Sequence, residues 1–253
     1  MNRVPVWDPA ELAELFLKEP EVHLYGLADL EEPFWSASRW YRDGDAVVAR
    51  ISVGDDWVAG YAMTKGAPHA TLSLLHEIEP DLPTGTWITG PLGMGEHLAS
   101  TRTLSPKGPH WRVILEGTER LGDSSKAVIL TGDDLPPLLD LHESDPGAVF
   151  FLPSMLRNGH FVGIWEANQL VASAGTHVAS TRHDVVAIGA VITRPSHRGR
   201  GLAAAVLSGL CRDLSTRYRT IGLNVVASNT EALRLYAGLG FRKVHQYEEV
   251  ELG

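Results

Sequence analysis

A nearly unbroken apolar run toward the C-terminal end limits what this chain can fold into. Residues 184–193 read DVVAIGAVIT, and every position from 185 to 192 is apolar or glycine. A strand with one face in water alternates apolar and polar residues, so this run predicts a strand in the middle of a sheet that is covered on both faces. After the loop 194–201, RPSHRGRG, a helix is expected from its apolar stripe of Leu207, Leu210, Cys211 and Leu214.

Strand and helix patterns alternate through the rest of the chain. Strands are expected at 46–51, 57–62, 111–116, 126–131, 161–166, 170–177, 221–226 and 241–252. Helices are expected at 9–18, 68–79, 134–144 and 232–239, and the stretch 80–95 is loop-rich. The polar run 117–125 is the best candidate for a boundary. We therefore expect a mixed α/β fold in two parts, an N-terminal α/β lobe over 1–122 and a domain with a mixed sheet over 123–253.

Charge and composition exclude several classes of protein. The 253 residues include 31 acidic and 22 basic side chains, a net charge of −9, which argues against nucleic acid as a partner. A single cysteine cannot form an internal disulfide, and no apolar stretch approaches the roughly 18 residues of a membrane span. We therefore expect a cytoplasmic protein without a membrane partner. The 11 histidines are scattered, with no HExxH motif and no cysteine pair, so no metal site is expected.

The glycine-rich loop at the start of the predicted C-terminal helix has the composition of an anion site. A helix's first turn carries N–H groups without acceptors and a partial positive charge. Gly199 and Gly201 let the backbone approach a ligand closely. Arg198 and Arg200 add charged donors, unless they are a solvated surface pair. The loop therefore predicts a site for the phosphate of a small ligand.

A dinucleotide is one possible phosphate ligand, because residues 199–204 satisfy the pattern GxGxxG/A. That pattern requires its first glycine directly after a strand and an acid about 20 residues later for the ribose. Here the five residues 194–198 separate Thr193 from Gly199, and the next predicted strand ends in VVASN, without an acid. A dinucleotide-dependent oxidoreductase is therefore the weaker hypothesis.

Two segments of the chain resemble the GNAT superfamily of N-acetyltransferases. The run 191–203, VITRPSHRGRGLA, contains the signature Q/R-x-x-G-x-G/A. One helix and one strand later, the run 229–241, NTEALRLYAGLGF, resembles the family's N-x-x-A-x-x-x-Y-x-x-x-G-F segment. The resemblance covers roughly residues 125 to 253 and implies the GNAT acyl-CoA N-acyltransferase fold. The lobe 1–122 loosely resembles a degenerate GNAT half, as in tandem members, or is an unrelated cap that shapes the acceptor cleft.

The resemblance implies acetyl-CoA as the cosubstrate and assigns the residues that contact it. Backbone amides of the loop would wrap the pyrophosphate, through Arg198, Gly199, Arg200, Gly201, Leu202 and Ala203. Free backbone groups of the central strand would pair with the pantetheine and polarise the acetyl carbonyl, at Ala190, Val191, Ile192 and Thr193. The Asn229 side chain would contact the CoA arm, and the Tyr236 hydroxyl would protonate the leaving sulfur.

Each of these side chains also has a structural interpretation. Tyr236 lies on an apolar helix stripe and could be a core aromatic. Asn229 could instead begin its helix. Cys211 falls on a buried stripe and is expected to be a core residue.

The residue that takes the proton from the acceptor is left open. Some GNAT enzymes carry a glutamate on the central strand for this purpose, and Ala187 aligns with it. The candidates for the base are water or one of four side chains, His183, Asp184, His177 and Glu166.

Together these features predict an enzyme that transfers an acetyl group from acetyl-CoA to a primary amine by direct attack in a ternary complex. The acceptor would be a small molecule or a peptide. The alternative is a non-catalytic sensor that binds acyl-CoA, which the missing strand glutamate favours mildly and the presence of Tyr236 opposes. The sequence identifies neither the acceptor nor the oligomeric state.

Overall fold

The chain folds into two compact units that interleave along the sequence. The computed structural model describes residues 4–53, 57–145, 147 and 150–253. Unit 1 comprises Met1–Arg112, Asn224–Thr230 and Lys243–Gly253, and unit 2 comprises Val113–Leu223 and Glu231–Arg242. Two late segments of the chain, Asn224–Thr230 and Lys243–Gly253, thus return to unit 1. The division into domains at 1–122 and 123–253 stays a prediction.

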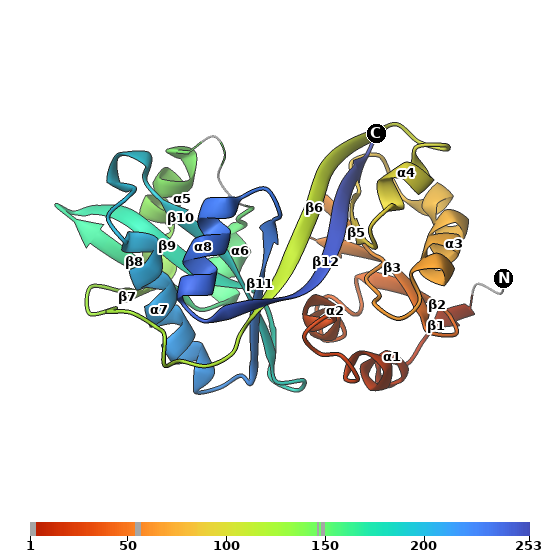
Figure 1. Cartoon of the computed structure of the whole chain (residues 1–253), viewed down its shortest axis with the longest axis horizontal. Helices are drawn as coiled ribbons and strands as arrows, with labels where there is room; N and C mark the ends of the chain where they lie inside the picture. The colour runs from red at the N-terminus through yellow and green to blue at the C-terminus, as the bar shows by residue number, and fades with distance from the viewer. Residues whose placement is uncertain (1–3, 54–56, 146, 148–149) are drawn as a thin grey trace. The chain divides into compact units, whose positions relative to one another are not determined.

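Unit 1 is an α/β unit built mainly from the first half of the chain (Figure 1). Its strands are β1 (Val4–Val6), β2 (Ser38–Asp43), β3 (Ala46–Val53), β4 (Trp57–Tyr61), β5 (Trp87–Gly90) and most of β6 (Leu104–Leu115) and β12 (Phe241–Leu252). Its helices are α1 (Pro9–Phe16), α2 (Leu24–Asp29), α3 (Pro68–Ile78), the 3-10 turn η1 (Glu79–Asp81) and α4 (Met94–Leu98). The stretch 80–95, expected to be loop-rich, thus contains β5, which pairs with a strand far away in sequence.

The sheet of unit 1 has the order β1-β2-β3-β4-β5-β12-β6. Strands β1 to β4 are antiparallel, β4 and β5 are parallel, and β12 is antiparallel to β5, with Glu248 opposite Gly90. One cluster of the core joins α3 to the sheet through Leu74, Leu75, Val48, Ile88 and Val250. Another packs the rings of Phe16, Trp40 and Tyr61 together, with centroids 5.4–5.9 Å apart.

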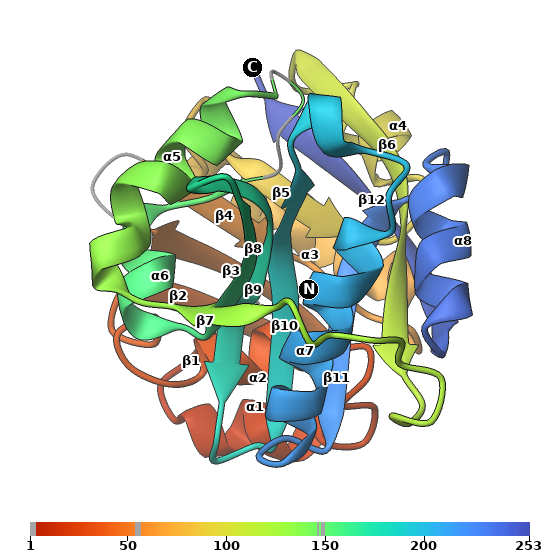
Figure 2. The ribbon, with the colours of Figure 1, turned by 90° about the vertical axis from the view of Figure 1, so that its left-hand side faces the viewer.

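Unit 2 contains the central strand and the loop that the sequence singled out (Figure 2). Its strands are β7 (Val128–Leu130), β8 (Phe161–Glu166), β9 (Gln169–Ser180), β10 (Val185–Thr193) and most of β11 (Thr220–Val226). Its helices are η2 (Gly132–Asp134), α5 (Leu135–Glu143), α6 (Pro153–Asn158), η3 (Pro195–His197), α7 (Leu202–Ser215) and nearly all of α8 (Thr230–Gly238).

The apolar run occupies β10, in the interior of its sheet. The order in unit 2 is β11-β10-β9-β8-β7, with β10 parallel to β11 and the other pairs antiparallel. Leucines of α5 and α6 form one cluster with Ala190 and Ile192, and α7 packs on β8, β9 and β10 with its buried stripe of Val206, Leu207, Leu210 and Leu214. The mixed α/β fold predicted from the sequence is therefore confirmed. Among the residues that the structure describes, the helices are too short or too polar to cross a bilayer.

Candidate functional site

A β-bulge interrupts β10 at the residues expected to contact the acetyl group. Gly189 pairs with Gly175 on β9, and Ile192 pairs with Ser173, so Ala190 and Val191 together face a single residue of β9. Ala190 has φ 49°, in the left-handed region that side chains rarely adopt. Because a bulge turns backbone groups out of the regular ladder, the peptide groups of Ala190 and Val191 are directed differently from those of the strand around them.

The other edge of β10 is open from the same point onward. The parallel ladder with β11 runs from Val185↔Thr220 to Ile188↔Leu223, whereas β10 continues to Thr193. Within the described chain, the backbone beyond Ile188 therefore has no ladder partner on the β11 side, although it still pairs with β9 on the other side. The hydroxyl oxygen of Thr193 is also buried without a hydrogen-bond partner among the described residues. An extended ligand with amide groups could pair with this edge as a strand would.

The loop between β10 and α7 has the backbone conformation of an anion site. Gly199 and Gly201 have φ 74° and 76°, and a Cβ added to either would meet no atom within 4 Å. Glycine is therefore required by the conformation, and space for a ligand lies beside both residues. Gly201 is the N-cap of α7, and no side chain of the described residues donates or accepts a capping hydrogen bond at this end. The first turn bond is from the Ala205 N–H to the Gly201 carbonyl at 3.1 Å, so the N–H groups of residues 202–204 have no acceptor in the helix.

The arginines of this loop are engaged with carboxylates, which changes the role expected for them. Arg200 donates two hydrogen bonds to Glu166 at 2.8 and 2.9 Å, and Arg198 forms an ion pair with Asp145. Both guanidinium groups remain about half exposed. The hydrogen bonds from Arg200 hold the pKa of Glu166 below its ordinary value. Each guanidinium thus already has a carboxylate partner, and the cosubstrate contacts expected of Arg198 and Arg200 stay predictions.

Tyr236 and Asn229, expected to contact the cosubstrate, fall in different units. Tyr236 belongs to unit 2, on α8, where its ring is 8% exposed and meets Phe241 edge-on at 5.8 Å. Burial raises the pKa of Tyr236 to about 12, so the phenol keeps its proton at neutral pH. Asn229 belongs to unit 1, in the turn after β11, where its N–H donates to the Val226 carbonyl at 3.0 Å. The roles assigned to these two side chains stay predictions.

Three of the four candidate bases are poorly suited to reach the bulge or to accept a proton. His183 and Asp184 lie in the turn before β10, and Asp184 is about 20 Å from Ala190 along an extended strand. Asp184 also accepts a hydrogen bond from the Arg219 N–H at 2.8 Å. Glu166 accepts a hydrogen bond from Arg200 on each of its two carboxylate oxygens, so both oxygens are already engaged.

His177 is the candidate that lies beside the bulge. Ala187 pairs with Val178 and Ile188 pairs with Thr176, so His177 is the extra residue of a second bulge, on β9. The ring of Phe150 stacks on its imidazole, with centroids 5.7 Å apart. Burial lowers the pKa of His177 to about 4, so the ring is neutral at pH 7. The sequence named His177 among the candidates, but the register that places it here has no local signal.

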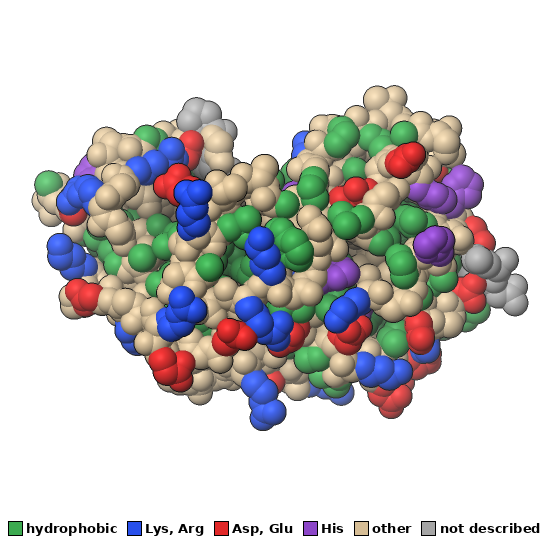
Figure 3. All heavy atoms as spheres, in the orientation of Figure 1, with side chains coloured by type: hydrophobic (Ala, Val, Ile, Leu, Met, Phe, Trp, Pro, Cys, Tyr) green, Lys and Arg blue, Asp and Glu red, His purple; other side chains and the backbone are tan. Residues whose placement is uncertain are grey.

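The remaining expectations for the site concern metals, thiols and charge. Cys211 is buried, and burial raises the pKa of its thiol to about 12, which fits a core residue. In the described ranges, no group of three or more His, Cys, Asp or Glu side chains could hold a metal ion. On the face drawn in Figure 3, basic and acidic side chains are interspersed.

The central strand parts from its parallel neighbour and leads into a glycine loop and a helix, as the resemblance to GNAT proteins implied. Comparisons with known proteins agree. Residues 162–250 match the family described as FR47-like protein. The C-terminal part of the chain therefore carries a GNAT-related, FR47-like domain. No curated protein matches the chain in sequence.

Solved structures with this fold cover most or all of the chain. A GNAT-family protein from Novosphingobium aromaticivorans is 25% identical, with a TM-score of 0.55 over 77% of this chain and 84% of its own. A GCN5-related N-acetyltransferase-like protein from Streptococcus suis is 17% identical, with a TM-score of 0.63 over 97% and 98%. A tandem GNAT protein from the clavulanic acid biosynthesis pathway is 11% identical, with a TM-score of 0.58 over 99% and 98%. The fold is thus that of GNAT acyltransferases, and it supports acyl transfer from acyl-CoA as the class of reaction.

Proposed function

We propose that this protein transfers the acetyl group of acetyl-CoA to a primary amine by direct attack, without a covalent enzyme intermediate. The observation that carries the proposal is the continuity of three features on residues 189–204: the bulge, the open edge of β10 and the glycine loop. These fit a long ligand with a phosphate at one end and a thioester at the other. The amides of 199–204 would hold the pyrophosphate, and the backbone of 189–193 would pair with the pantetheine amides.

The bulge and Tyr236 supply the groups that the thioester chemistry needs. As the amine nitrogen bonds to the carbonyl carbon, negative charge gathers on the carbonyl oxygen, and backbone donors at Ala190 and Val191 would stabilise it. When the carbon–sulfur bond breaks, the electron pair goes to sulfur. A thiolate is a good leaving group, so one positioned phenol, that of Tyr236, would be a sufficient acid.

We assign the role of base to His177. The amine nitrogen becomes a strongly acidic ammonium once it has bonded to the carbonyl, so a weak base is enough to take its proton. The His177 ring is neutral at pH 7, because burial lowers its pKa to about 4, and a neutral imidazole carries one ring nitrogen without a proton. Its position beside Gly189 places it next to the bulged residue Ala190.

Ligand binding and turnover test the proposal separately. CoA and acetyl-CoA should raise the melting temperature by mass action, whereas NAD and NADP should not. Gly201→Glu, which places a carboxylate at the start of α7, should abolish the rise. Gly132→Glu, at another glycine with open space around its Cα, is the matched control and should preserve it. A rise with NAD and none with CoA would overturn the assignment.

Turnover distinguishes the enzyme from an acyl-CoA sensor. Release of CoA thiol should be followed over a panel of polyamines, amino acids, aminoglycosides and peptide N-termini. We expect at least one primary amine to be acetylated, with N-acetyl product detected by mass spectrometry. Binding of CoA without turnover of any amine would favour the sensor, for which the same glycine loop would suffice.

A further inference from the structure

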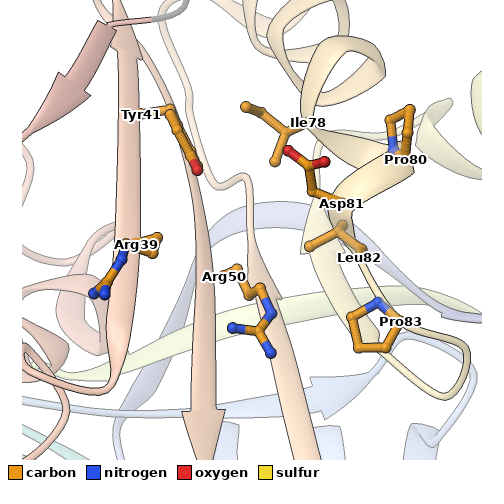
Figure 4. Close-up of a pocket in the computed structure, with 8 residues that line it drawn as sticks. All are labelled: Arg39, Tyr41, Arg50, Ile78, Pro80, Asp81, Leu82 and Pro83. Atoms are coloured by element: carbon orange, nitrogen blue, oxygen red, sulfur yellow. The ribbon is translucent and has the colours of Figure 1, made fainter.

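A second candidate site lies in unit 1, in a cavity of about 500 Å³ (Figure 4). Strands β2 and β3 form one side of it, with Arg39, Tyr41 and Arg50. The end of α3 and the turn η1 form the opposite side, where Ile78, Asp81 and Leu82 lie with two prolines. All of these residues belong to unit 1, so the cavity is complete within that unit.

The cavity begins where the apolar cover of the β2–β3 hairpin ends. Tyr41 pairs with Val48 and Arg39 pairs with Arg50, so these four side chains project from the same face of the two strands. Val48 is fully buried under α3, in one cluster with Leu75 and Ile78. The next cross-strand pair on this face of the hairpin is Arg39 and Arg50. It lies beyond the end of α3 at Ile78, and two arginines stand there in place of apolar residues.

The two arginines are directly opposite each other, and neither forms an ion pair with a carboxylate of the described residues. Cross-strand pairs have Cβ atoms about 4.5–5.5 Å apart, and like charges at that spacing repel. The Arg39 guanidinium donates to the neighbouring Ser38 carbonyl at 2.8 Å, and the Arg50 guanidinium makes no hydrogen bond or ion pair with any residue that the structure describes. Asp81 lines the same cavity, on the opposite wall. Two uncompensated guanidinium groups at the mouth of a cavity are the donor set for an anion.

We propose that this cavity binds a small organic carboxylate with an apolar body. Arg39 and Arg50 would hold the carboxylate, whose two oxygens match the planar donors of guanidinium groups. The apolar body would lie against Ile78, Leu82 and the ring of Tyr41. Inorganic phosphate has no apolar body to lie against these side chains, so we expect it to bind more weakly. The site goes beyond the acetyl transfer proposed for unit 2, and its test does not depend on that activity.

Calorimetric titration of the full chain with four probes tests the class of ligand. Phenylacetate and hexanoate should bind with a stoichiometry of one. Phenylacetamide, which keeps the shape of phenylacetate but lacks the charge, and inorganic phosphate should both bind at least about tenfold more weakly. Phosphate binding as tightly as phenylacetate would overturn the proposal, and so would the absence of saturable binding by both carboxylates.

Variants test the site itself. Arg39→Gln and Arg50→Gln should each raise the Kd of phenylacetate about tenfold or more, because a charged hydrogen bond is lost. Arg42→Gln, on the other face of β2 opposite Val47, is the matched control and should leave the Kd unchanged. Without ligand, the two Gln variants should melt no lower than the parent, since each relieves the repulsion of the pair. A lower melting temperature for Arg39→Gln or Arg50→Gln would show that these arginines stabilise the fold, and it would contradict the proposal. The same Kd for phenylacetate in all three variants would also contradict it.

Discussion

His177 lies directly against Gly189: a Cβ placed on the glycine would stand 3.1 Å from both the Cβ and the Nδ1 of the histidine. That separation is tighter than ordinary van der Waals contact, so the imidazole occupies the space where residue 189 would carry a side chain. Gly189 is also the last paired residue before the bulge at Ala190. The bare glycine therefore lets a neutral imidazole reach the part of β10 where we place the reaction.

Replacing His177 should slow the reaction without weakening cosubstrate binding. We expect His177→Gln to lower kcat/KM by about 10²- to 10⁴-fold, the range for general bases. The rate of this variant should rise as the pH is raised, because hydroxide can replace the missing base. Initial rates of CoA thiol release between pH 6 and 9 measure both effects. His160→Gln is the control, since His160 pairs with Asp213 at 3.2 Å on α7. Equal rates for His177→Gln and His160→Gln would show that His177 is not the base and would favour water in that role.

Replacing Tyr236 should remove a proton donor while keeping a buried ring in place. Tyr236→Phe should lower kcat by about 10- to 1000-fold and leave the Kd of CoA nearly unchanged. Tyr218→Phe, beyond the end of α7, serves as the control. If Tyr236→Phe turns over at the parental rate, Tyr236 is a core aromatic and the acid must be sought elsewhere.

Removing the charge of Glu166 should tighten CoA binding. Its carboxylate accepts two hydrogen bonds from Arg200, at 2.8 and 2.9 Å, beside the loop that we expect to bind pyrophosphate. Glu166→Gln should lower the Kd of CoA by about three- to tenfold at low salt, and Arg200→Gln should raise it by a similar factor. The difference should shrink near 0.3 M salt, about where screening becomes strong. Calorimetric titration with CoA measures the two Kd values, with Glu143→Gln on α5 as the control. A Kd that is unchanged in both Glu166→Gln and Arg200→Gln would contradict the prediction.

Acid should destabilise unit 1 through His23. This ring stacks on Phe16 at 4.5 Å and shares a 2.7 Å hydrogen bond with the Tyr61 hydroxyl, and burial lowers its pKa from 6.5 to about 3. Because the folded pKa is the lower one, the stabilisation is complete above pH 6.5 and is lost as the pH falls toward 3. Between pH 7 and pH 5 the free energy of unfolding should fall by about 2 kcal/mol through this group.

Urea unfolding at pH 7 and pH 5 measures this loss. His23→Gln keeps a polar group near Tyr61 but cannot titrate, so its free energy of unfolding should depend on pH less steeply than that of the parent, by about 2 kcal/mol over this interval. His69→Gln, on α3, should leave the pH dependence unchanged. Parallel pH profiles for His23→Gln and the parent would contradict the assignment.

Local patterns in the sequence predicted the elements that carry the site. The apolar run at 184–193 is β10, Val185–Thr193, and the stripe after the glycine loop is α7, Leu202–Ser215. Both are defined by neighbouring residues, so their periodicity is visible in one stretch of sequence. The motif ending in Gly240 and Phe241 likewise marks the end of α8 at Gly238.

Features that depend on pairing between distant segments could not be predicted in this way. The bulges at Ala190 and His177 are properties of the register between β9 and β10, and neither strand alone reveals it. The acids that engage Arg198 and Arg200 lie far away in sequence, at Asp145 and Glu166, so the arginines looked like free donors. The boundary near residue 122 was predicted from one polar run, and that run carries no signal of the late segments that return to unit 1.

The return of late segments to unit 1 determines the order in which the two units can be completed during translation. Strand β5 pairs with β12, which is synthesised much later. The indole N–H of Trp87 on β5 donates a hydrogen bond of 2.8 Å to the carboxylate of Glu249, 162 residues further along the chain. All of unit 2 is synthesised before that last segment of unit 1. Unit 1 is thus begun first during translation and completed last. Until Lys243–Gly253 has been synthesised, the edge of β5 that pairs with β12 stays open, and a strand from another chain could pair with it.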